Sequence, residues 1–396
     1  MLNPKLDTLD EYTFFRLNDL LGDIKPKTNR EPILLSIGEP QNQPPALLAE
    51  TIAPNADSWN RYPPPNGDEP FRLAVTDWLT RRYRLPDELV DSDKNVIPVP
   101  GTREPLFMLG VLAVGEEKSG QTPAVLIPNP HYHVYRGAAM VGRAEPVYLP
   151  ARAETNFLPD LDAITPEILA RAAILYICSP SNPQGTVAPL DYLKRAITLA
   201  REHDFLLAID ECYAEIYRGA EPPGALQACA ELGGGLDNVV VLHSLSKRSS
   251  AAGMRSGFIA GDERLIARYT QLVTFGGSPQ PLPILRAATA LWRDEDHVVA
   301  NRAHYARNFT AAQEILGPVM NYHNPEAGFF LWLDVGDGVA VAERLWREAA
   351  IKTLPGAFMA KEEADGTNPG ARYLRVALVY EETRTREGLT RMVELL

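Results

Sequence analysis

The fold of this chain is indicated most clearly by one stretch, His243-Ser-Leu-Ser-Lys-Arg-Ser-Ser-Ala-Ala-Gly-Met-Arg-Ser-Gly-Phe258. It follows an apolar run, Val239-Val-Val-Leu242, which predicts a buried strand that ends in a polar loop. That loop carries two hydroxyls, one lysine and one arginine, namely Ser244, Ser246, Lys247 and Arg255. A lysine can form a Schiff base with an aldehyde, and hydroxyls with an arginine suit a phosphate. Taken alone, Ser-x-Ser-Lys is more often an exposed loop, so the rest of the chain has to decide.

The composition is that of an ordinary globular protein. The chain has 396 residues, of which 45% are hydrophobic and 23% charged, and its formal net charge is −12. An acidic chain is a poor partner for nucleic acid, which requires a basic surface. No apolar run approaches the roughly 18 residues that span a bilayer, and residues 1–10 carry acids where a signal peptide would be apolar. We therefore expect a cytoplasmic protein with neither a nucleic-acid nor a membrane partner.

The cysteines and histidines indicate no metal site. The three cysteines, Cys178, Cys212 and Cys229, are too few for a disulfide framework and lack the spacing of metal ligands. We expect them to be small buried side chains. His131 and His133 have no partner cluster in the sequence and are expected to be structural or exposed.

The order of the apolar segments indicates an α/β fold. Between residues 94 and 261, short β-rich runs alternate with helical patterns, and the strand candidates are 95–99, 124–127, 145–149, 174–177, 205–209, 239–242 and 257–260. Such alternation predicts a mostly parallel seven-stranded sheet with helices on both faces, and near-continuous apolar strands agree with it. We predict a large domain over residues 45–283, a smaller α+β domain over 284–396, and an N-terminal arm over 1–44 that forms part of the smaller domain.

Polar residues follow the predicted strands, at the edge where ligands gather in open α/β sheets. Asp210 could pair with a protonated pyridine nitrogen, and Tyr213 could hydrogen-bond a ring oxygen. Taken singly, Asp210 is equally well a helix cap and Tyr213 a core residue. Asn182 lies between prolines that fix its loop, so its amide can be aimed at a ligand, although alone it would be a turn residue.

Two further strand ends suit a phosphate and a flat ring. The segment Pro100-Gly-Thr-Arg-Glu104 leads into a helical run, and a glycine-led helix N-terminus offers free N–H groups to a phosphate. Arg103 could add charge there or simply lie exposed. Tyr132 could stack on a flat ring, but singly it would more often be a core residue. Pyridoxal 5′-phosphate carries an aldehyde, a phosphate and a pyridine ring, and all these clusters could serve it.

Together the clusters resemble the class I/II aminotransferases, pyridoxal-phosphate enzymes of fold type I, over essentially the whole chain. The resemblance implies that Lys247 is the Schiff-base lysine and that Asp210 contacts the pyridine nitrogen. Tyr213 and Asn182 would contact the ring oxygen, and Tyr132 would stack on the ring. The groups implied around the phosphate are Thr102, Ser244, Ser246, Arg255 and the backbone of Gly101 and Arg103. In this family pattern, Lys247, Asp210 and Tyr213 are the catalytic residues.

The resemblance also implies contacts with the substrate carboxylate. Leu35-Ser-Ile-Gly-Glu-Pro40 is similar to the family's N-terminal loop, in which the backbone of a glycine, here Gly38, touches that carboxylate. Arg375, within Arg372-Tyr-Leu-Arg-Val-Ala377, would clamp it in a bidentate manner, for which a planar guanidinium is suited. Asn182 is expected at the substrate as well.

A further segment implies a dimer. Asn60-Arg-Tyr-Pro63, followed by Gly67, resembles the loop that sends a tyrosine to the phosphate of the neighbouring subunit. Here that tyrosine is Tyr62. The resemblance therefore implies a homodimer with shared active sites.

The implied activity is a ping-pong transamination between an amino acid and 2-oxoglutarate. Within the family, residues 244–249, 253–257 and 101–104 are most similar to the N-succinyl-L,L-diaminopimelate aminotransferases of bacterial lysine synthesis. Because that substrate ends in carboxylates, a second cation near the site would be sensible, and Arg103 is the candidate. The segment Gly276-Gly-Ser-Pro-Gln280 departs from the subfamily's pattern at a loop that could line the substrate pocket.

Several alternatives remain open from the sequence. Aminotransferases of aspartate, alanine or aromatic amino acids, and pyridoxal-phosphate lyases or synthases, use the same residues and differ in pocket shape. A non-enzymatic regulator with this fold usually carries an attached DNA-binding domain, for which the chain is expected to have no spare length.

Overall fold

One seven-stranded sheet organises the larger part of the molecule. The computed structural model describes residues 12–322 and 324–396, and the strand order is β2-β8-β7-β6-β5-β3-β4. The strands are β2 (Val96–Val99), β3 (Ala124–Asn129), β4 (Glu145–Pro150), β5 (Ala172–Cys178), β6 (Leu206–Asp210), β7 (Val239–Ser244) and β8 (Gly257–Gly261). Only β8 runs antiparallel to its neighbours, β2 and β7. The predicted mostly parallel sheet is confirmed.

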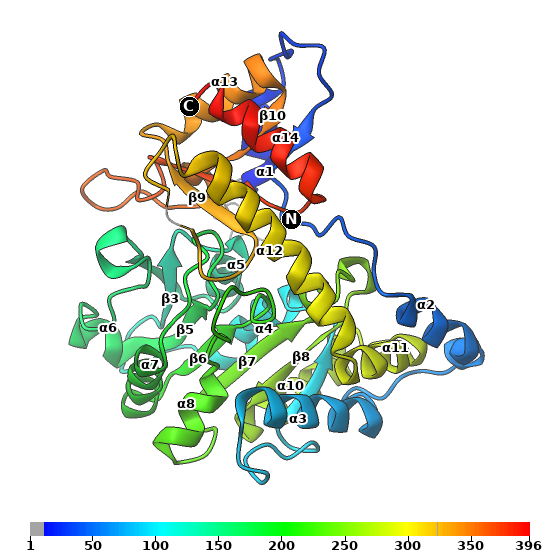
Figure 1. The fold of residues 1–396 in the computed structure, drawn as a ribbon. Coiled ribbons are helices and arrows are strands. Elements are labelled where there is room, and N and C mark those ends of the chain that lie inside the picture. Colours follow the sequence, from blue (N-terminus) through cyan, green and yellow to red (C-terminus); the bar gives the residue numbers. More distant parts are fainter. Residues whose placement is uncertain (1–11, 323) are drawn as a thin grey trace, which may run out of the picture.

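Helices cover both faces of this sheet (Figure 1). They are α3 (Glu69–Tyr83), α4 (Arg103–Ala113), α5 (His133–Val141), α6 (Pro166–Arg171), α7 (Leu190–Glu202), α8 (Ala225–Leu232), α10 (Glu263–Gly276) and α11 (Leu282–Arg293). Successive side chains of β6 enter opposite cores, because Leu207 and Ile209 join one hydrophobic cluster while Leu206 and Ala208 join another. The near-continuous apolar strands of the sequence follow from this two-sided burial.

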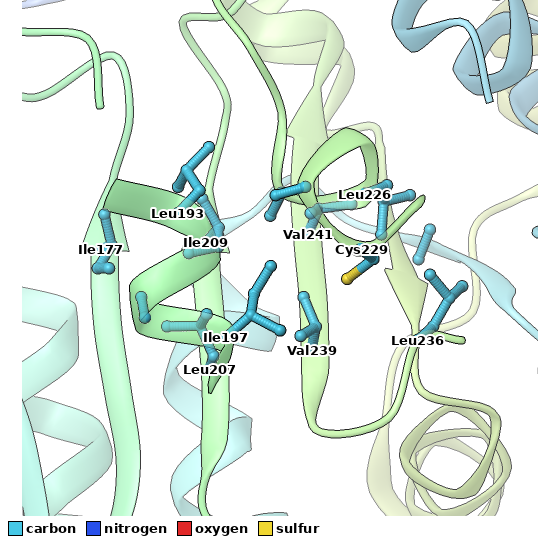
Figure 2. Close-up of a cluster of buried hydrophobic side chains, with 14 of the residues drawn as sticks. Ile177, Leu193, Ile197, Leu207, Ile209, Leu226, Cys229, Leu236, Val239 and Val241 are labelled. Atoms are coloured by element: carbon cyan, nitrogen blue, oxygen red, sulfur yellow. The ribbon is translucent and has the colours of Figure 1, made fainter. Parts of the chain in front are cut away.

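Figure 2 shows how one of these clusters is built, between the strands β5–β7 and the helices α7 and α8. Leu193 and Ile197 lie one turn apart on α7 and share the face that packs against Leu207 and Ile209. Cys229 of α8 is fully buried there, as predicted for a small apolar side chain. The packing fixes the strand ends relative to one another.

The smaller part is built around a second sheet of order β11-β12-β9. Its strands are β9 (Phe330–Asp334), β11 (Leu354–Pro355) and β12 (Tyr373–Ala377), and its helices are α12 (Asp296–Leu316), α13 (Gly338–Ala349) and α14 (Glu382–Val393). The N-terminal region adds α1 (Thr13–Leu21) and β1 (Ile33–Leu34), which pairs in parallel with β10 (Ile351–Lys352). The remaining elements are α2 (Ala46–Ile52), α9 (Leu245–Arg248) and short 3₁₀ turns at Ala53–Asn60, Ala153–Thr155, Ala252–Met254 and Gly356–Phe358.

Helix α11 belongs by its packing to the larger part. Leu285, Leu291 and Trp292 lie in the same cluster as the side chains of the seven-stranded sheet, and α12 then runs from α11 to the second sheet (Figure 1). We therefore propose that the boundary between the two parts follows Arg293 rather than residue 283. Residues 1–11, which the sequence assigns to the arm and on which the absence of a signal peptide was judged, lie outside the described residues.

The helices of the two described segments, 12–322 and 324–396, include none with the length and apolar character of a membrane span. The cytoplasmic location expected from the sequence stays a prediction.

Candidate active site

A cavity of about 550 Å³ opens at the carboxyl ends of β5, β6 and β7, a size typical of small-molecule sites. Its wall contains almost every predicted site residue: Gly38, Thr102, Arg103, Tyr132, Asn182, Asp210, Tyr213, Ser244, Ser246, Lys247, Arg255 and Arg375. Of the remaining two, Gly101 lies next to the wall residue Thr102, and Tyr62 is fully exposed to solvent away from the cavity. The structure therefore gathers residues from segments far apart in the sequence.

Lys247 lies on the one-turn helix α9, directly after β7. Its Nζ donates a hydrogen bond of 2.5 Å to the carbonyl oxygen of Gly38 and lies 5.2 Å from the ring centre of Phe329. Burial lowers the pKa of Lys247 to about 8, because desolvation disfavours the charged amine. A substantial share of the side chain is therefore neutral near physiological pH, which is the form that attacks a carbonyl or accepts a proton.

Asp210 ends β6 and is only 3% exposed. Its carboxylate accepts two long hydrogen bonds, each 3.3 Å, from the Tyr135 hydroxyl and the Cys212 backbone N–H. Within the described residues, no lysine or arginine forms an ion pair with it, and burial raises its pKa. Two long hydrogen bonds offset only a small part of the cost of burying this negative charge. The carboxylate is therefore suited to accept a hydrogen bond from a cationic N–H group in the cavity, such as a protonated pyridine.

Tyr213 stands on the same loop as Asp210, at the border with the smaller part. Its ring packs edge-on against Phe329 and Phe330, with centroid distances of 5.4 Å and 5.8 Å. Burial raises the pKa of Tyr213 well above its usual value, so the hydroxyl keeps its proton. It can therefore donate a hydrogen bond to an oxygen in the cavity.

Arg375 reaches the cavity from β12 of the smaller part. One guanidinium nitrogen donates to Asn182 Oδ1 at 2.9 Å and another to the Ser36 carbonyl at 2.7 Å, while Cζ lies 4.3 Å from the centre of the Phe330 ring. Burial lowers the pKa of Arg375 to about 10, which leaves it charged at neutral pH. It has no carboxylate partner among the described residues, and its Nε is buried without a hydrogen bond. This desolvated cation is suited to bind a carboxylate.

The hydroxyl groups of Ser244 and Ser246 lie 2.9 Å apart where β7 ends. Arg255 is held beside them by hydrogen bonds to the carbonyls of Ala252 and Pro100, at 2.9 Å and 3.0 Å. Gly101 has a φ of +76°, and a Cβ there would lie 2.5 Å from Arg255 Nη2, so only glycine fits. With the N-terminus of α4, which begins at Arg103, these groups form a cradle suited to a phosphate.

Aromatic and imidazole side chains complete the wall. Arg103 Nε donates to the Tyr132 hydroxyl at 2.8 Å, which fixes both side chains at the cavity. His131 and His133, expected to be structural or exposed, also line the cavity. Burial lowers their pKa values to about 3 and about 4, so both are neutral at physiological pH.

Some features differ from the predictions. The segment 276–280 does not line the cavity within this chain. Instead Gln280 is buried, and its amide donates to the carbonyls of Val99 and Arg255 at 2.9 Å and 2.6 Å. These two hydrogen bonds hold the backbone of the segments that form the phosphate cradle. Cys212, expected to be buried, is only half-buried and lines the cavity beside Asp210.

This combination of lysine, carboxylate, phosphate cradle and cationic arginine is suited to hold pyridoxal phosphate, and comparison with known proteins shows the family. The family model for class I and II aminotransferases matches residues 30–388. The chain therefore belongs to this family, its cofactor is pyridoxal phosphate, and it is an aminotransferase.

Individual relatives cover the whole chain. The LL-diaminopimelate aminotransferase of Aquifex aeolicus is 31% identical over 405 residues, which cover 99% of this chain and 98% of the relative. The crystal structure of an aminotransferase from Neisseria meningitidis has 37% identity and a TM-score of 0.94, and covers 100% of both chains. A probable N-succinyldiaminopimelate aminotransferase from Thermus thermophilus has 26% identity and a TM-score of 0.83, and covers 97% of this chain and 100% of the other. The predicted fold and family are confirmed.

Asp210→Asn tests the buried carboxylate. The amide has the same shape but cannot stabilise a proton on the pyridine nitrogen, so we expect the cofactor to stay bound. We expect kcat to fall about a hundredfold or more, or about 3 kcal/mol, the scale of one lost electrostatic contact in a catalytic site. Steady-state kinetics and cofactor content measure this, with Asp262→Asn, at a buried helix cap remote from the cavity, as the control. Near-normal turnover would show that Asp210 serves only the local turn.

Proposed function

We propose that this aminotransferase transfers the amino group of N-succinyl-L,L-diaminopimelate to 2-oxoglutarate. The observation that supports this proposal is an excess of positively charged side chains in a second cavity, which Arg103 also lines. This second cavity of about 770 Å³ shares seven lining residues with the first, among them Arg103, His131 and Arg255 of the phosphate cradle. The charged residues that line it are Arg16, Arg103, Arg136, Arg255 and Lys361 and a single acid, Glu104.

The charge of this second cavity favours an acidic substrate tail. Burial, together with the nearby Arg136 and Arg16, lowers the pKa of Lys361, as expected where cations repel one another. An anionic group entering the cavity would relieve that repulsion. The succinylated compound ends in two carboxylates, whereas the unmodified diamino acid ends in a carboxylate and an ammonium. The positive cavity therefore supports the succinylated donor over the unmodified compound named for the Aquifex aeolicus relative.

The side chains of the first cavity would divide the chemistry among them. Bound pyridoxal phosphate supplies an aldehyde and an electron-accepting ring. Lys247 would hold the aldehyde until the substrate amine displaces it, and its neutral Nζ would then take the Cα proton and deliver it to the former aldehyde carbon of the cofactor. Arg375 and Asn182 would orient the substrate by its α-carboxylate. Asp210 would keep the ring nitrogen protonated, and Tyr213 would donate a hydrogen bond to the ring oxygen.

A panel of amino donors with 2-oxoglutarate tests the proposed substrate. It contains N-succinyl-L,L-diaminopimelate, LL-diaminopimelate, aspartate, alanine and tyrosine. We expect kcat/KM for the succinylated donor to exceed the others by roughly tenfold or more, since one charged hydrogen bond contributes about 1.5–3 kcal/mol. A preference for unmodified LL-diaminopimelate would refute the role of the extra charge, and a preference for aspartate, alanine or tyrosine would refute the diaminopimelate class. Release of pyruvate without conversion of the cofactor to its amine form would indicate a lyase.

We also propose that the enzyme is a homodimer whose subunits share their sites. Tyr62 follows the 3₁₀ segment Ala53–Asn60 and is fully exposed, although a large aromatic ring is normally at least partly covered. Its place in the family pattern supports a contact with the phosphate of the second subunit. This contact would bury the ring and complete the cradle around Ser244 and Arg255.

Hybrid dimers test the shared site. Tyr62→Phe alone should only loosen the cofactor, by roughly 1.5–3 kcal/mol for one hydrogen bond to a charged group. Tyr62→Glu, which would place a carboxylate at the phosphate, is the better partner for Lys247→Ala. Each parent should be inactive, whereas hybrids purified through two different tags should have about half the wild-type activity per dimer, because one site combines both intact residues. A mixture of Lys247→Ala with Lys247→Arg is the control, and inactive Tyr62→Glu/Lys247→Ala hybrids would refute the shared site.

A further inference from the structure

The helix that bears Lys247 is too short to hold itself in place. Helix α9 has four residues, Leu245–Arg248, and a single turn is not stable in isolation. The last carbonyls of any helix lack partners within it. In α9, the carbonyls of Lys247 and Arg248 receive hydrogen bonds from outside, from the side chain of Asn301 on α12.

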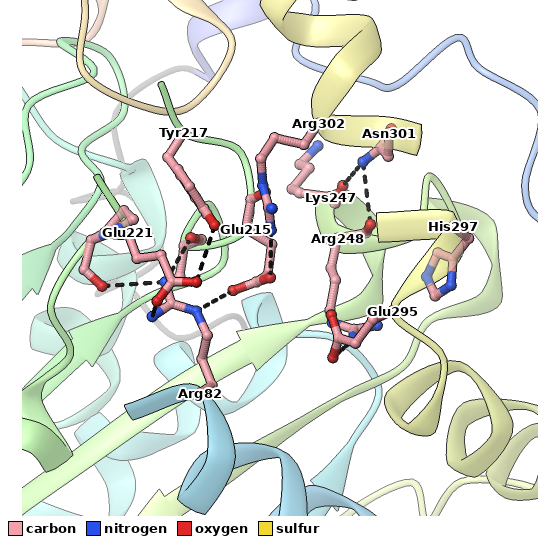
Figure 3. Close-up of polar contacts among 12 residues, drawn as sticks. Arg82, Glu215, Tyr217, Glu221, Lys247, Arg248, Glu295, His297, Asn301 and Arg302 are labelled. Carbon is pink, nitrogen blue, oxygen red and sulfur yellow. Dashed lines mark hydrogen bonds and ion pairs between the residues drawn. The ribbon is translucent and has the colours of Figure 1, made fainter. Parts of the chain in front are cut away.

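Asn301 contacts two segments through one amide, residues 247–250 and Asn42. Its Nδ2 donates to the carbonyls of Lys247 and Arg248 at 3.0 Å and 3.2 Å (Figure 3). Its Oδ1 accepts from the Ser250 hydroxyl at 3.1 Å and from Asn42 Nδ2 at 3.4 Å. The amide therefore uses both its donor and its acceptor to hold the backbone that carries Lys247.

The preceding turn of α12 holds the same loop. His297 Nε2 lies 2.8 Å from the Ser249 hydroxyl, and its Nδ1 contacts the carboxylate of Asp294. Since His297 and Asn301 are four residues apart, they lie on one face of the helix. Residues 247–250 are thus attached to α12 at several consecutive points.

The residue after Asn301 holds the other catalytic loop. Arg302 donates to the Glu215 carboxylate and carbonyl, each at 3.1 Å, and its guanidinium lies 4.0 Å from the Tyr217 ring centre. The Glu215 side chain is 5% exposed and also pairs with Arg82 Nε at 2.7 Å (Figure 3). Glu215 belongs to the loop that begins with Asp210, so consecutive residues of α12 support both loops.

We propose that Asn301 is a positioning residue for Lys247, and that α12 keeps the amine of Lys247 in register with Asp210. The inference rests on the proposed role of Lys247. Asn301 is not among the residues that line the cavity, so it acts only by fixing the backbone on which Lys247 stands. Loss of its amide would leave two carbonyls without donors and would let residues 247–250 move.

Two variants and one matched control test this proposal in the full-length, cofactor-loaded enzyme. Asn301→Ala removes all contacts of the amide, and Ser250→Ala removes one of them more gently. Asn308→Ala is the control, because Asn308 lies on the same helix and also donates to two carbonyls, those of Leu378 and Tyr380, but in the smaller part.

The readouts separate positioning from general stability. For Asn301→Ala we expect hydrogen exchange in residues 245–251 to accelerate about tenfold, as two lost hydrogen bonds imply. We expect kcat to fall about tenfold to a hundredfold, as a small misplacement of a reacting group implies, with little change in KM because the hydrogen bonds of Arg375 go to Asn182 and Ser36 and not to α12. Ser250→Ala should change both in the same direction but less, and Asn308→Ala should change neither.

Unchanged exchange at residues 245–251 in Asn301→Ala would overturn the proposal, as would an equal fall of kcat in Asn308→Ala. If Asn301→Ala does not fold, Ser250→Ala decides, and wild-type exchange together with wild-type kcat would then overturn it. The exchange measurement does not depend on which lysine binds the cofactor. A failure of the proposed role of Lys247 would therefore show as faster exchange without loss of kcat.

Discussion

The parallel pairing of β6 with its neighbours is the constraint on which the site depends. Cys178 of β5 lies opposite Asp210, and Asp210 lies opposite Leu242 of β7, so three strands end at the same edge. Their register places Asp210 next to the segment that carries Ser244 and Lys247. Because both faces of these strands are buried in apolar clusters, a slip of one residue would turn every core side chain to the wrong face. The core therefore fixes the relative positions of the polar groups.

The smaller part contributes what the large sheet cannot supply. Arg375 and Gly38 come from segments packed around the second sheet and close the cavity from above the strand ends. This closure removes water from Lys247 and Arg375, and it lowers the pKa values of both side chains. The same burial raises the pKa of Asp210. Covering of the strand ends thus favours the neutral amine that Lys247 needs to attack a carbonyl or accept a proton. It also leaves the Asp210 carboxylate and the Arg375 guanidinium in surroundings where a ligand group of opposite charge is favoured.

Features encoded in local sequence could be predicted, and contacts between distant segments could not. The seven strands were readable because each is a short apolar run, and Lys247, Asp210 and Asn182 stand where such runs end. Nothing in the sequence links Tyr135 to Asp210, since each residue looks like an ordinary core or loop residue until β6 and α5 are packed together.

Contacts between distant segments also explain the other differences between the sequence predictions and the structure. Asn301 is one of many polar residues in a long helix, and its role depends on where α12 crosses α9. The loop of residues 276–280 could line the substrate pocket by its sequence, but the amide of Gln280 donates to two backbone carbonyls instead. A polar side chain in a loop can form the same hydrogen bonds with a ligand or with the backbone, and the packing around it determines which of the two it contacts.

We expect the cofactor to be attached to Lys247. Borohydride reduction of the cofactor-loaded enzyme, followed by peptide mapping with mass spectrometry, tests it directly, because reduction fixes the pyridoxal group to the lysine that binds it. We expect loss of the visible absorbance band and a single modified peptide that contains Lys247. A pyridoxal group on any other lysine, with Lys247 unmodified, would contradict it.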